Sequence, residues 1–173
     1  STMEQGLAEE LDSNSAVQNW GAVYTKSTTI YNAKGESASV SIVATAKDSD
    51  LTRYVTFRTR KGHKTISFDS GSVILTEKTA ENLGLHTGDT FWVENAEGTR
   101  VELTLTGITE NYMFTRLYLP RAQLESLLGT AEIPWNTVYG QTSCTDAAGY
   151  NALRTDLLDC NYVSSISFTE DTT

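Results

Sequence analysis

The chain has 173 residues, 39% of them hydrophobic and 20% charged, which is the composition of a folded globular protein and not of a disordered one. Its formal net charge of −9, from 13 Lys and Arg against 22 Asp and Glu, repels polyanions and disfavours binding to nucleic acids. No window approaches the ~20 apolar residues of a membrane-spanning helix. The chain opens with Ser-Thr-Met and no signal peptide, so we expect a fragment of a longer protein.

The N-terminal third predicts one helix and a long β-hairpin. Residues 4–12 carry apolar side chains at helical spacing among glutamates. β-Branched and aromatic residues dominate 17–31, and an alternating segment at 39–46 follows a turn at 32–36. A helical turn is expected after this hairpin, within 47–54.

The next segment combines a strand pattern with the densest basic run of the chain. Residues 54–60 alternate, with Val55 and Phe57 facing one way, and predict a strand. The run "RTRKGHK" (58–64) holds five potential cations. It is either a small anion-binding patch or the solvated end of a hairpin, and we favour the hairpin.

The most patterned stretch is "LTEKTAENLGLHTGDTFWV" (75–93). A phosphate-binding loop places its glycines before a helix, whereas here the helix precedes Gly84. His86 and Asp89 are too few ligands for a metal site. We therefore expect a structural role: a helix with Thr76 as N-cap that ends at a left-handed Gly84, then a turn and a strand.

The sequence after this stretch predicts further strands and a helix. Two strands joined by a tight turn at Gly98 are expected between 91 and 108. Residues 110–119 are aromatic and favour a strand. Pro120 occupies the expected first position of a helix, and Gly129 is expected to cap its end.

The C-terminal segment predicts a strand at 135–143, a helix capped by Thr145 and a last strand at 162–168. Cys144 and Cys160 flank that helix. The ends of such a helix lie roughly 20 Å apart, whereas a disulfide requires Cα atoms within about 7 Å. We therefore expect no bridge between the two cysteines.

This order of elements predicts an α+β fold. We expect residues 1–64 and 109–173 to form one α/β subdomain, with 65–108 as a small β-rich subdomain inserted into it. The sequence has no G-x-S-x-G motif and no His close to either Cys, and its carboxylates stand singly. We predict no catalytic, cofactor or metal site, and no enzymatic activity.

The segment "GSVILTEKTAENLGLHTGDTFWVENAEGTRVELTLTGITENYMFTRLYLP" resembles the extracytoplasmic region of FtsX-like ABC transporter permeases, the group that includes the MacB-like periplasmic core domain. The family pattern is a short strand, a helix that ends in "A..LGL..GD", and a strand, charged turn and strand that end in "V.GI". Here the pattern runs from Val73 to Ile108, with "LGL" at Leu83–Leu85 and "GD" at Gly88–Asp89.

The resemblance implies a porter-like α/β sandwich with an inserted β-rich subdomain. It also implies a non-enzymatic domain on the extracytoplasmic side of the cell membrane, in a parent permease that is dimeric and pairs with a cytoplasmic ABC ATPase. ATP hydrolysis would then be coupled to movement of the domain or to its engagement of an extracellular protein, peptide or lipid cargo. A dedicated adaptor-docking loop is not identifiable in the sequence.

Two other functions stay open at this point. One is a secreted or surface-attached module that binds a peptide or glycan, and its motive is the aromatic content around Tyr112, Met113, Phe114 and Trp135. These four residues are the candidate partner contacts, although a place in the strand core is the favoured interpretation for them. The other is a hydrolase whose site is assembled from distant residues in a cleft.

Overall fold

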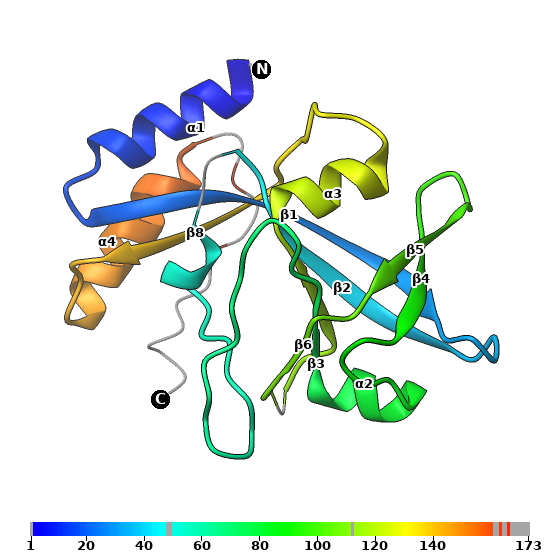
Figure 1. The fold of residues 1–173 in the computed structure, drawn as a ribbon. Coiled ribbons are helices and arrows are strands. Elements are labelled where there is room, and N and C mark those ends of the chain that lie inside the picture. The colour runs from blue at the N-terminus through cyan, green and yellow to red at the C-terminus, as the bar shows by residue number, and fades with distance from the viewer. Residues whose placement is uncertain (1, 48–49, 112, 161–162, 164–165, 167–173) are drawn as a thin grey trace. The chain divides into compact units, whose positions relative to one another are not determined.

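The structure is a computed structural model that describes residues 2–47, 50–111, 113–160, 163 and 166. Its helices and strands are labelled in Figure 1. In chain order they are α1 (Thr2–Ser13), β1 (Val17–Tyr31), β2 (Ser37–Thr45), the 3-10 turn η1 (Leu51–Arg53), β3 (Ile74–Thr76), α2 (Glu77–Leu83), β4 (Thr90–Glu94), β5 (Arg100–Thr104), β6 (Gly107–Thr109), β7 (Arg116–Leu119), α3 (Arg121–Leu128), β8 (Thr137–Thr142) and α4 (Ala147–Leu158).

The chain divides into two compact units. Unit 1 comprises Ser1–Trp20 and Gly140–Thr173, and unit 2 comprises Gly21–Tyr139, so the boundaries fall within β1 and β8. The predicted subdomains, 1–64 with 109–173 and the insert 65–108, stay a prediction. Strands from 65–108 belong to the same sheet as β1 and β7.

Unit 1 contains α1, α4 and the adjoining ends of β1 and β8. Each helix contributes one buried leucine, Leu11 from α1 and Leu153 from α4. The indole Nε1 of Trp20 donates to Asp12 at 2.7 Å. Asp146, not the expected Thr145, is the N-cap of α4, and its carboxylate accepts the N–H of Gly149 at 2.8 Å.

The thiol of Cys160 provides a chemical test of unit 1. Burial, and then the carboxylates of Glu10 and Asp159, raise the pKa of this thiol above its ordinary value. The thiolate is the nucleophile, so in a Cys144→Ser background iodoacetamide should alkylate Cys160 more slowly at pH 8 than the same chain unfolded in urea. Glu10→Gln should raise the rate about twofold, because a charge near the surface contributes only a fraction of a kcal/mol. An unchanged rate in the Glu10→Gln variant would contradict the assignment.

Unit 2 is built on a mixed sheet in the order β5-β4-β1-β2-β7-β3-β6, and β8 pairs with β1 beside this path. The β1–β2 hairpin is antiparallel over Val23–Tyr31 and Ser37–Thr45. The parallel pairs are β2 with β7 and β3 with β6. The remaining pairs of the path are antiparallel.

Both faces of this sheet are covered, as strand alternation shows. In β7, Leu117 and Leu119 face one hydrophobic cluster and Tyr118 faces the other. The first cluster lies under α2 and α3, and the predicted face of the hairpin belongs to it. Its buried members are Tyr24, Ile30, Val40, Ile42, Ala44, Val73, Leu75, Ala80, Leu83, Leu85, Phe91, Val93, Leu103, Leu105, Leu117, Leu119, Leu124 and Leu127.

The second cluster is covered by the irregular segment 51–68 and not by a helix. Phe57 stacks on Phe68 with ring centroids 5.0 Å apart and meets Tyr118 edge-on at the same distance. Val55 packs against this cluster too, so it faces the same way as Phe57, as expected. The predicted strand at 54–60 is wrong, however: Arg58 makes only an isolated bridge, to Thr65.

Several other predicted elements are confirmed with shifted bounds. The predicted helical turn within 47–54 is η1. The strand expected at 110–119 is regular only from Arg116, in β7. Pro120 is the N-cap of α3 instead of its first residue, and Gly129 ends that helix with φ 70°. The strand expected at 162–168 lies outside the described residues, apart from the positions 163 and 166.

Gly107 in β6 marks a tight approach between two segments. A Cβ built on it would lie 2.6 Å from Cγ2 of Ile66 and 3.6 Å from Cγ1 of Ile74. We predict that Gly107→Ala lowers the free energy of unfolding by about 1–3 kcal/mol, the usual range for overpacking. A urea-denaturation cycle with Ile66→Ala should show the double variant losing less than the sum of the single losses. Additive losses would place the strain elsewhere.

Candidate functional site

The patterned stretch 75–93 has the structural role that its sequence predicts. Gly84 is left-handed with φ 62°, and the N–H of Leu85 donates to the carbonyl of Ala80 at 2.8 Å, which closes a Schellman cap. Thr76 is the N-cap residue of α2, but its hydroxyl does not cap the helix. It bonds instead to Arg116 of β7, whose N–H donates to it at 2.9 Å.

His86 and Asp89 hold the following turn together. The backbone N–H of His86 donates to Oδ2 of Asp89 at 2.8 Å, and the imidazole Nδ1 lies 3.6 Å from the same oxygen. Across the described residues, no group of three or more His, Cys, Asp or Glu side chains is placed to hold a metal ion. The pair therefore serves the turn, in the way that Asp commonly does.

Two hollows in unit 2 are the places to look for a spatially assembled catalytic site. One lies along β1, and the other is lined in part by Lys47, Asp50, Ser70 and Arg121. In the second hollow, Asp50 is engaged with both the N–H and the hydroxyl of Thr52. Neither hollow is lined by a His or Cys, so neither brings a nucleophile to an imidazole base.

An exposed apolar loop is the first feature that suits a binding partner. We call Asn111, Met113 and Phe114, between β6 and β7, the tip loop. Met113 is 81% exposed and Phe114 is 44% exposed. The side-chain oxygen of Asn111 accepts the N–H groups of both, at 2.9 and 3.0 Å, which fixes the turn. Met113 and Phe114 therefore present apolar side chains to solvent, with their backbone N–H groups held by Asn111.

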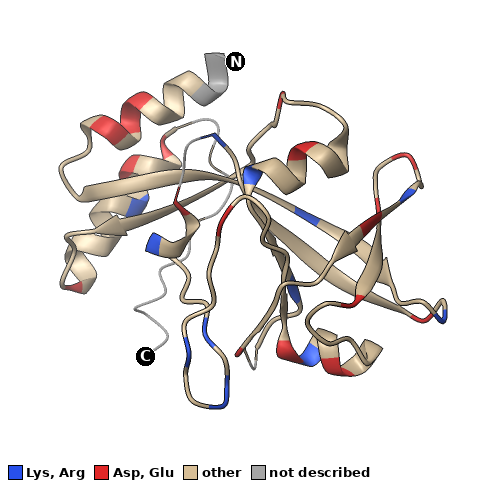
Figure 2. Ribbon diagram, in the orientation of Figure 1, with Lys and Arg blue, Asp and Glu red and all other residues tan. Residues whose placement is uncertain are grey.

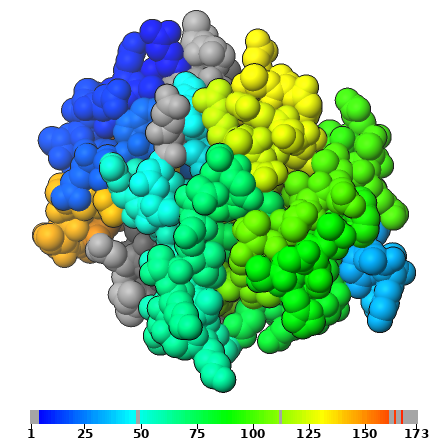
Figure 3. All heavy atoms as spheres, in the orientation of Figure 1, coloured from blue at the N-terminus to red at the C-terminus, as the bar shows by residue number. Residues whose placement is uncertain are grey.

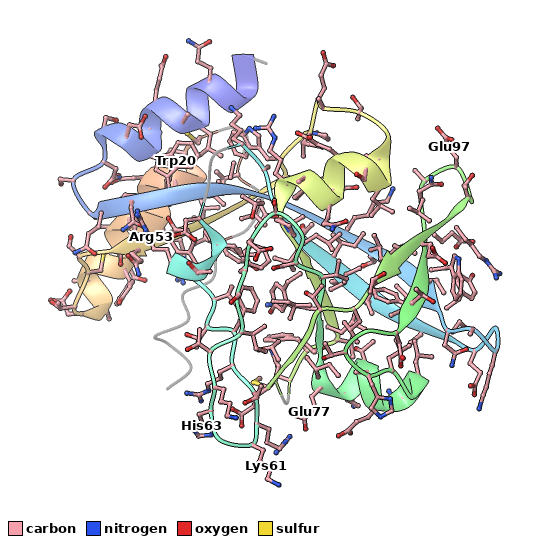
Figure 4. The ribbon with its side chains drawn as sticks, viewed as in Figure 1. Trp20, Arg53, Lys61, His63, Glu77 and Glu97 are labelled. Carbon is pink, nitrogen blue, oxygen red and sulfur yellow. The ribbon has the colours of Figure 1, made fainter. Side chains whose placement is uncertain are left out.

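A basic hairpin is the second such feature. Residues 58–64 form it, through the Arg58–Thr65 bridge and the N–H of Thr59 on the carbonyl of Lys64 at 2.9 Å. The blue of Lys and Arg marks this hairpin in Figure 2, and it projects from unit 2 in Figure 3. The predicted hairpin end is thus confirmed. Lys61 and His63 lie at its far end, as Figure 4 shows.

The two features are joined through the end of β6. The carbonyl of Arg58 accepts the N–H of Glu110 at 2.8 Å, and its N–H donates to Oγ1 of Thr109 at 3.2 Å. The carboxylate of Glu110 lies 3.2 Å from Nε of Arg58 and 3.9 Å from Nε2 of His63. The tip loop begins at the next residue, so the hairpin and the loop share one anchoring point.

Part of the charge of the hairpin is neutralised within unit 2. Arg58 pairs with Glu110, and Arg60 pairs with Glu77 at the start of α2. Lys61 and Lys64 are exposed, and neither has an ion pair within the described part of the chain. The site therefore combines two cations without an ion pair, Lys61 and Lys64, with the exposed apolar side chains of the tip loop.

The predicted contact residues that the structure describes differ in exposure. Met113 and Phe114 are exposed on the tip loop, and the Arg116 guanidinium lies 4.0 Å from the centroid of the Phe114 ring. Trp135, in contrast, is only 9% exposed, with the Lys47 ammonium 5.6 Å from its ring centroid. Tyr112 lies outside the described residues. The hairpin was missed as part of the site because its link to the loop is not local in sequence.

Similarity to known proteins is found among solved structures and not among sequences. No protein-family model matches the sequence, and no curated protein matches it. Among solved structures, the extracellular domain of the noncanonic ABC-type transporter YknZ from Gram-positive bacteria is similar, with a TM-score of 0.58 and 18% identity. The alignment covers 89% of this chain and 79% of that one.

A second similar structure is the periplasmic region of MacB from Actinobacillus actinomycetemcomitans. Its TM-score is 0.51 and its identity 14%, over 91% of this chain and 73% of that one. These values show a shared fold. The predicted α+β class is confirmed, and the resemblance seen in residues 71–120 is confirmed at the level of the fold.

Proposed function

We propose that this chain is the extracytoplasmic domain of an ABC transporter permease. The observation that carries the proposal is the similarity to the YknZ extracellular domain over 89% of the chain, and the MacB periplasmic region supports it. Since the "LGL..GD" motif was recognised independently of the fold, sequence and structure favour the same family. No helix within the described ranges is both long and apolar enough to cross a membrane, so a parent permease would supply the membrane segments.

In this proposal the domain is a mechanical part that carries no chemistry of its own. A cytoplasmic ATPase subunit hydrolyses ATP, the membrane helices of a dimeric parent permease move, and this domain moves with them or engages a protein, peptide or lipid cargo. The tip loop and the basic hairpin are the surface that we assign to that engagement. Met113 and Phe114 would supply apolar contact area, and Lys61 and Lys64 would attract acidic groups.

The parent gene provides the first test. Its reading frame should encode apolar segments of about 20 residues on both sides of this domain, and a neighbouring gene should encode an ATP-binding subunit. A parent protein with no such segment on either side would rule out the permease assignment.

Labelling in intact cells provides the second test. Glu97 is exposed in the turn between β4 and β5, and Figure 4 shows it at the end of that hairpin. A Glu97→Cys variant of the parent protein, with Cys144 and Cys160 changed to Ser, should react with a membrane-impermeant maleimide from outside. The matched Cys-free protein should not. Reaction only after cell lysis would place the domain on the cytoplasmic side.

Coupling to ATP requires the assembled transporter. We expect hydrogen exchange in the tip loop or the basic hairpin to change when ATP and Mg²⁺ are added to the purified complex. Exchange in the strand β7, which is buried, serves as the internal control. An exchange pattern identical with and without ATP would contradict the coupling, while the labelling result would still decide the location.

A further inference from the structure

Strand β1 has a gap in its pairing, and the gap lies in unit 2. One edge of β1 is paired with β2 from Val23 to Tyr31. On the other edge, β4 pairs only with Ile30 and Tyr31, and the backbone of β4 turns away after Glu94, whose carbonyl accepts the Thr28 hydroxyl. β8 also pairs with β1, and Asn136, the residue before β8, bonds to Thr25. Residues 26–29 therefore lie between the segments of β1 that are bonded by these two neighbours.

The alternation of hydrogen-bonded and non-hydrogen-bonded pairs along the β1–β2 hairpin shows which backbone groups face this gap. Opposite residues of an antiparallel pair either exchange both of their bonds or direct both away from each other. Ser27 is opposite Ser41, and the N–H of Ser41 donates to Thr115 on its far side, at 3.0 Å. Ser27 must therefore direct its N–H and C=O away from β2, into the gap.

Next to the gap, at Thr25, a side-chain amide bonds to the edge of β1 in the way that the backbone of a neighbouring strand would. The side-chain amide of Asn136 accepts the N–H of Thr25 at 2.9 Å and donates to the carbonyl of Thr25 at 2.7 Å. Thr25 is two residues before Ser27, which is the repeat of outward-facing pairs along an antiparallel edge. The next outward pair is that of Ser27, which is exposed; the β1–β4 pairing does not reach it, and no turn or loop bond within the described ranges does.

A groove of about 270 Å³ lies over this gap. Its lining comes from β1, from Ile42 of β2, from residues 94–96 at the end of β4 and from the end of α3. The apolar lining includes Leu127 and Leu128 of α3, and Lys26 and Glu94 contribute opposite charges. Neither of these charged side chains has an ion pair in the part of the chain that the structure describes.

We propose that this gap binds an extended segment of a partner protein by β-strand addition at Ser27. Four residues at 3.3 Å each would fill it, about 13 Å of strand. The unpaired charges define the chemistry of the segment: an acidic residue opposite Lys26 and a basic or neutral one near Glu94. An aliphatic residue between them would pack on Leu127 and Leu128. The proposal rests on unit 2 alone and is independent of the permease assignment.

Amide exchange in the free 173-residue chain tests the open edge directly. By NMR, the N–H of Ser27 should exchange at least tenfold faster than those of Lys26 and Thr28, which face β2. Equal protection at the three positions would overturn the proposal, since it would mean that Ser27 already has a partner.

A displayed library of seven-residue peptides, flanked by Gly-Ser spacers, provides the binding probe. Peptides selected on the intact chain should protect the Ser27 amide and should lose at least tenfold in affinity for Ser27→Pro. This change removes the outward N–H, and its ring also fixes φ at position 27 and restricts Lys26. Ser27→Ala is the matched control that should keep the affinity. Lys26→Glu should shift the selected sequences from acidic to basic residues at one position.

Three outcomes would overturn strand addition at this edge. The first is that no peptide is enriched over the spacers alone, and the second is that the selected peptides leave the Ser27 amide unprotected. The third is that the Lys26→Glu variant selects peptides with the same charges as the unmodified chain. Should Ser27→Pro fail to fold by circular dichroism, protection of the Ser27 amide in the unmodified chain decides the question.

Discussion

Replacing Phe91 by Ala should cost about 3–5 kcal/mol of unfolding free energy, the largest single loss that we expect. Phe91 lies in β4 opposite Leu103, is 0% exposed, and belongs to the cluster under α2 and α3. Truncation removes the ring from a packed interior and leaves a cavity that the paired strands β4 and β5 cannot close. Urea denaturation followed by far-UV circular dichroism measures the loss.

The chain offers a matched control for the same substitution at a surface position. Phe114 in the tip loop is 44% exposed and is in contact with the guanidinium of Arg116. Phe114→Ala should cost below about 1 kcal/mol, the contribution of an exposed cation–π contact. If Phe91→Ala lost no more than Phe114→Ala, the assignment of Phe91 to the core would be wrong. Phe114→Ala is also the variant with which to probe the tip loop without damaging the fold.

Elements whose determinants are local could be predicted from the sequence. The end of α2 is an example, because Gly84 supplies the left-handed backbone and Leu85 the bond to Ala80 within a few residues. The β1–β2 hairpin is another, since its alternation and its turn at Gly35 lie in one continuous segment. Such signals also carried the recognition of the fold, which rests on the strand–helix–strand pattern of 71–120.

Features decided by distant contacts could not be predicted in this way. Residues 54–60 alternate like a strand, yet they cover the second cluster as an irregular segment whose pairing is limited to the Arg58–Thr65 bridge and the bond between Arg58 and Glu110. The division into two units also depends on distant contacts: β1 contributes to both units, and its length in sequence does not reveal where its partners change.

The candidate site shows the same division between local and distant causes. The basic run and the aromatic loop were each visible in the sequence, but their common anchor is a set of bonds between Arg58, Thr109 and Glu110, about 50 residues apart. Trp135 is of a residue type that is common in binding surfaces, yet its side chain is buried. The gap at Ser27 has no sequence signal, since it depends on where the pairing of β4 with β1 stops and on which residue of β1 the Asn136 side chain bonds.

Asn32 connects the β1–β2 turn to α2, and its loss should have the second largest effect. Its side-chain oxygen accepts the N–H groups of Lys34 and Glu36 at 3.0 and 2.9 Å. Its Nδ2 donates to the buried carbonyl of Leu83 at 3.0 Å and to the carboxylate of Glu36 at 3.0 Å. Asn32→Ala leaves the Leu83 carbonyl without this donor, so we expect a loss of about 2–3 kcal/mol.

Asn32→Asp separates the donating half of this amide from the accepting half. The aspartate keeps both acceptor bonds, but at neutral pH it places a carboxylate against the carbonyl of Leu83 and the carboxylate of Glu36. Both neighbours and the burial of the site disfavour the charged form, whereas the two retained N–H donors favour it. We expect the adjacent carboxylate and the burial to outweigh the donors, so that the pKa of the new group rises above its ordinary value of about 3.9.

A group whose folded pKa is raised stabilises the protein fully below its unfolded pKa, and this stability is lost as the pH rises through the folded pKa. The Asn32→Asp variant should therefore be as unstable as Asn32→Ala at pH 7 and should recover relative to wild type as the pH falls towards 4, where its protonated oxygen can donate to Leu83. Urea midpoints for wild type, Asn32→Asp and Asn32→Ala at pH 7, 5 and 4 measure this. Asn32→Ala, which does not titrate, corrects for every other group, so a constant gap between the two variants would show that Nδ2 does not carry the stability of this turn.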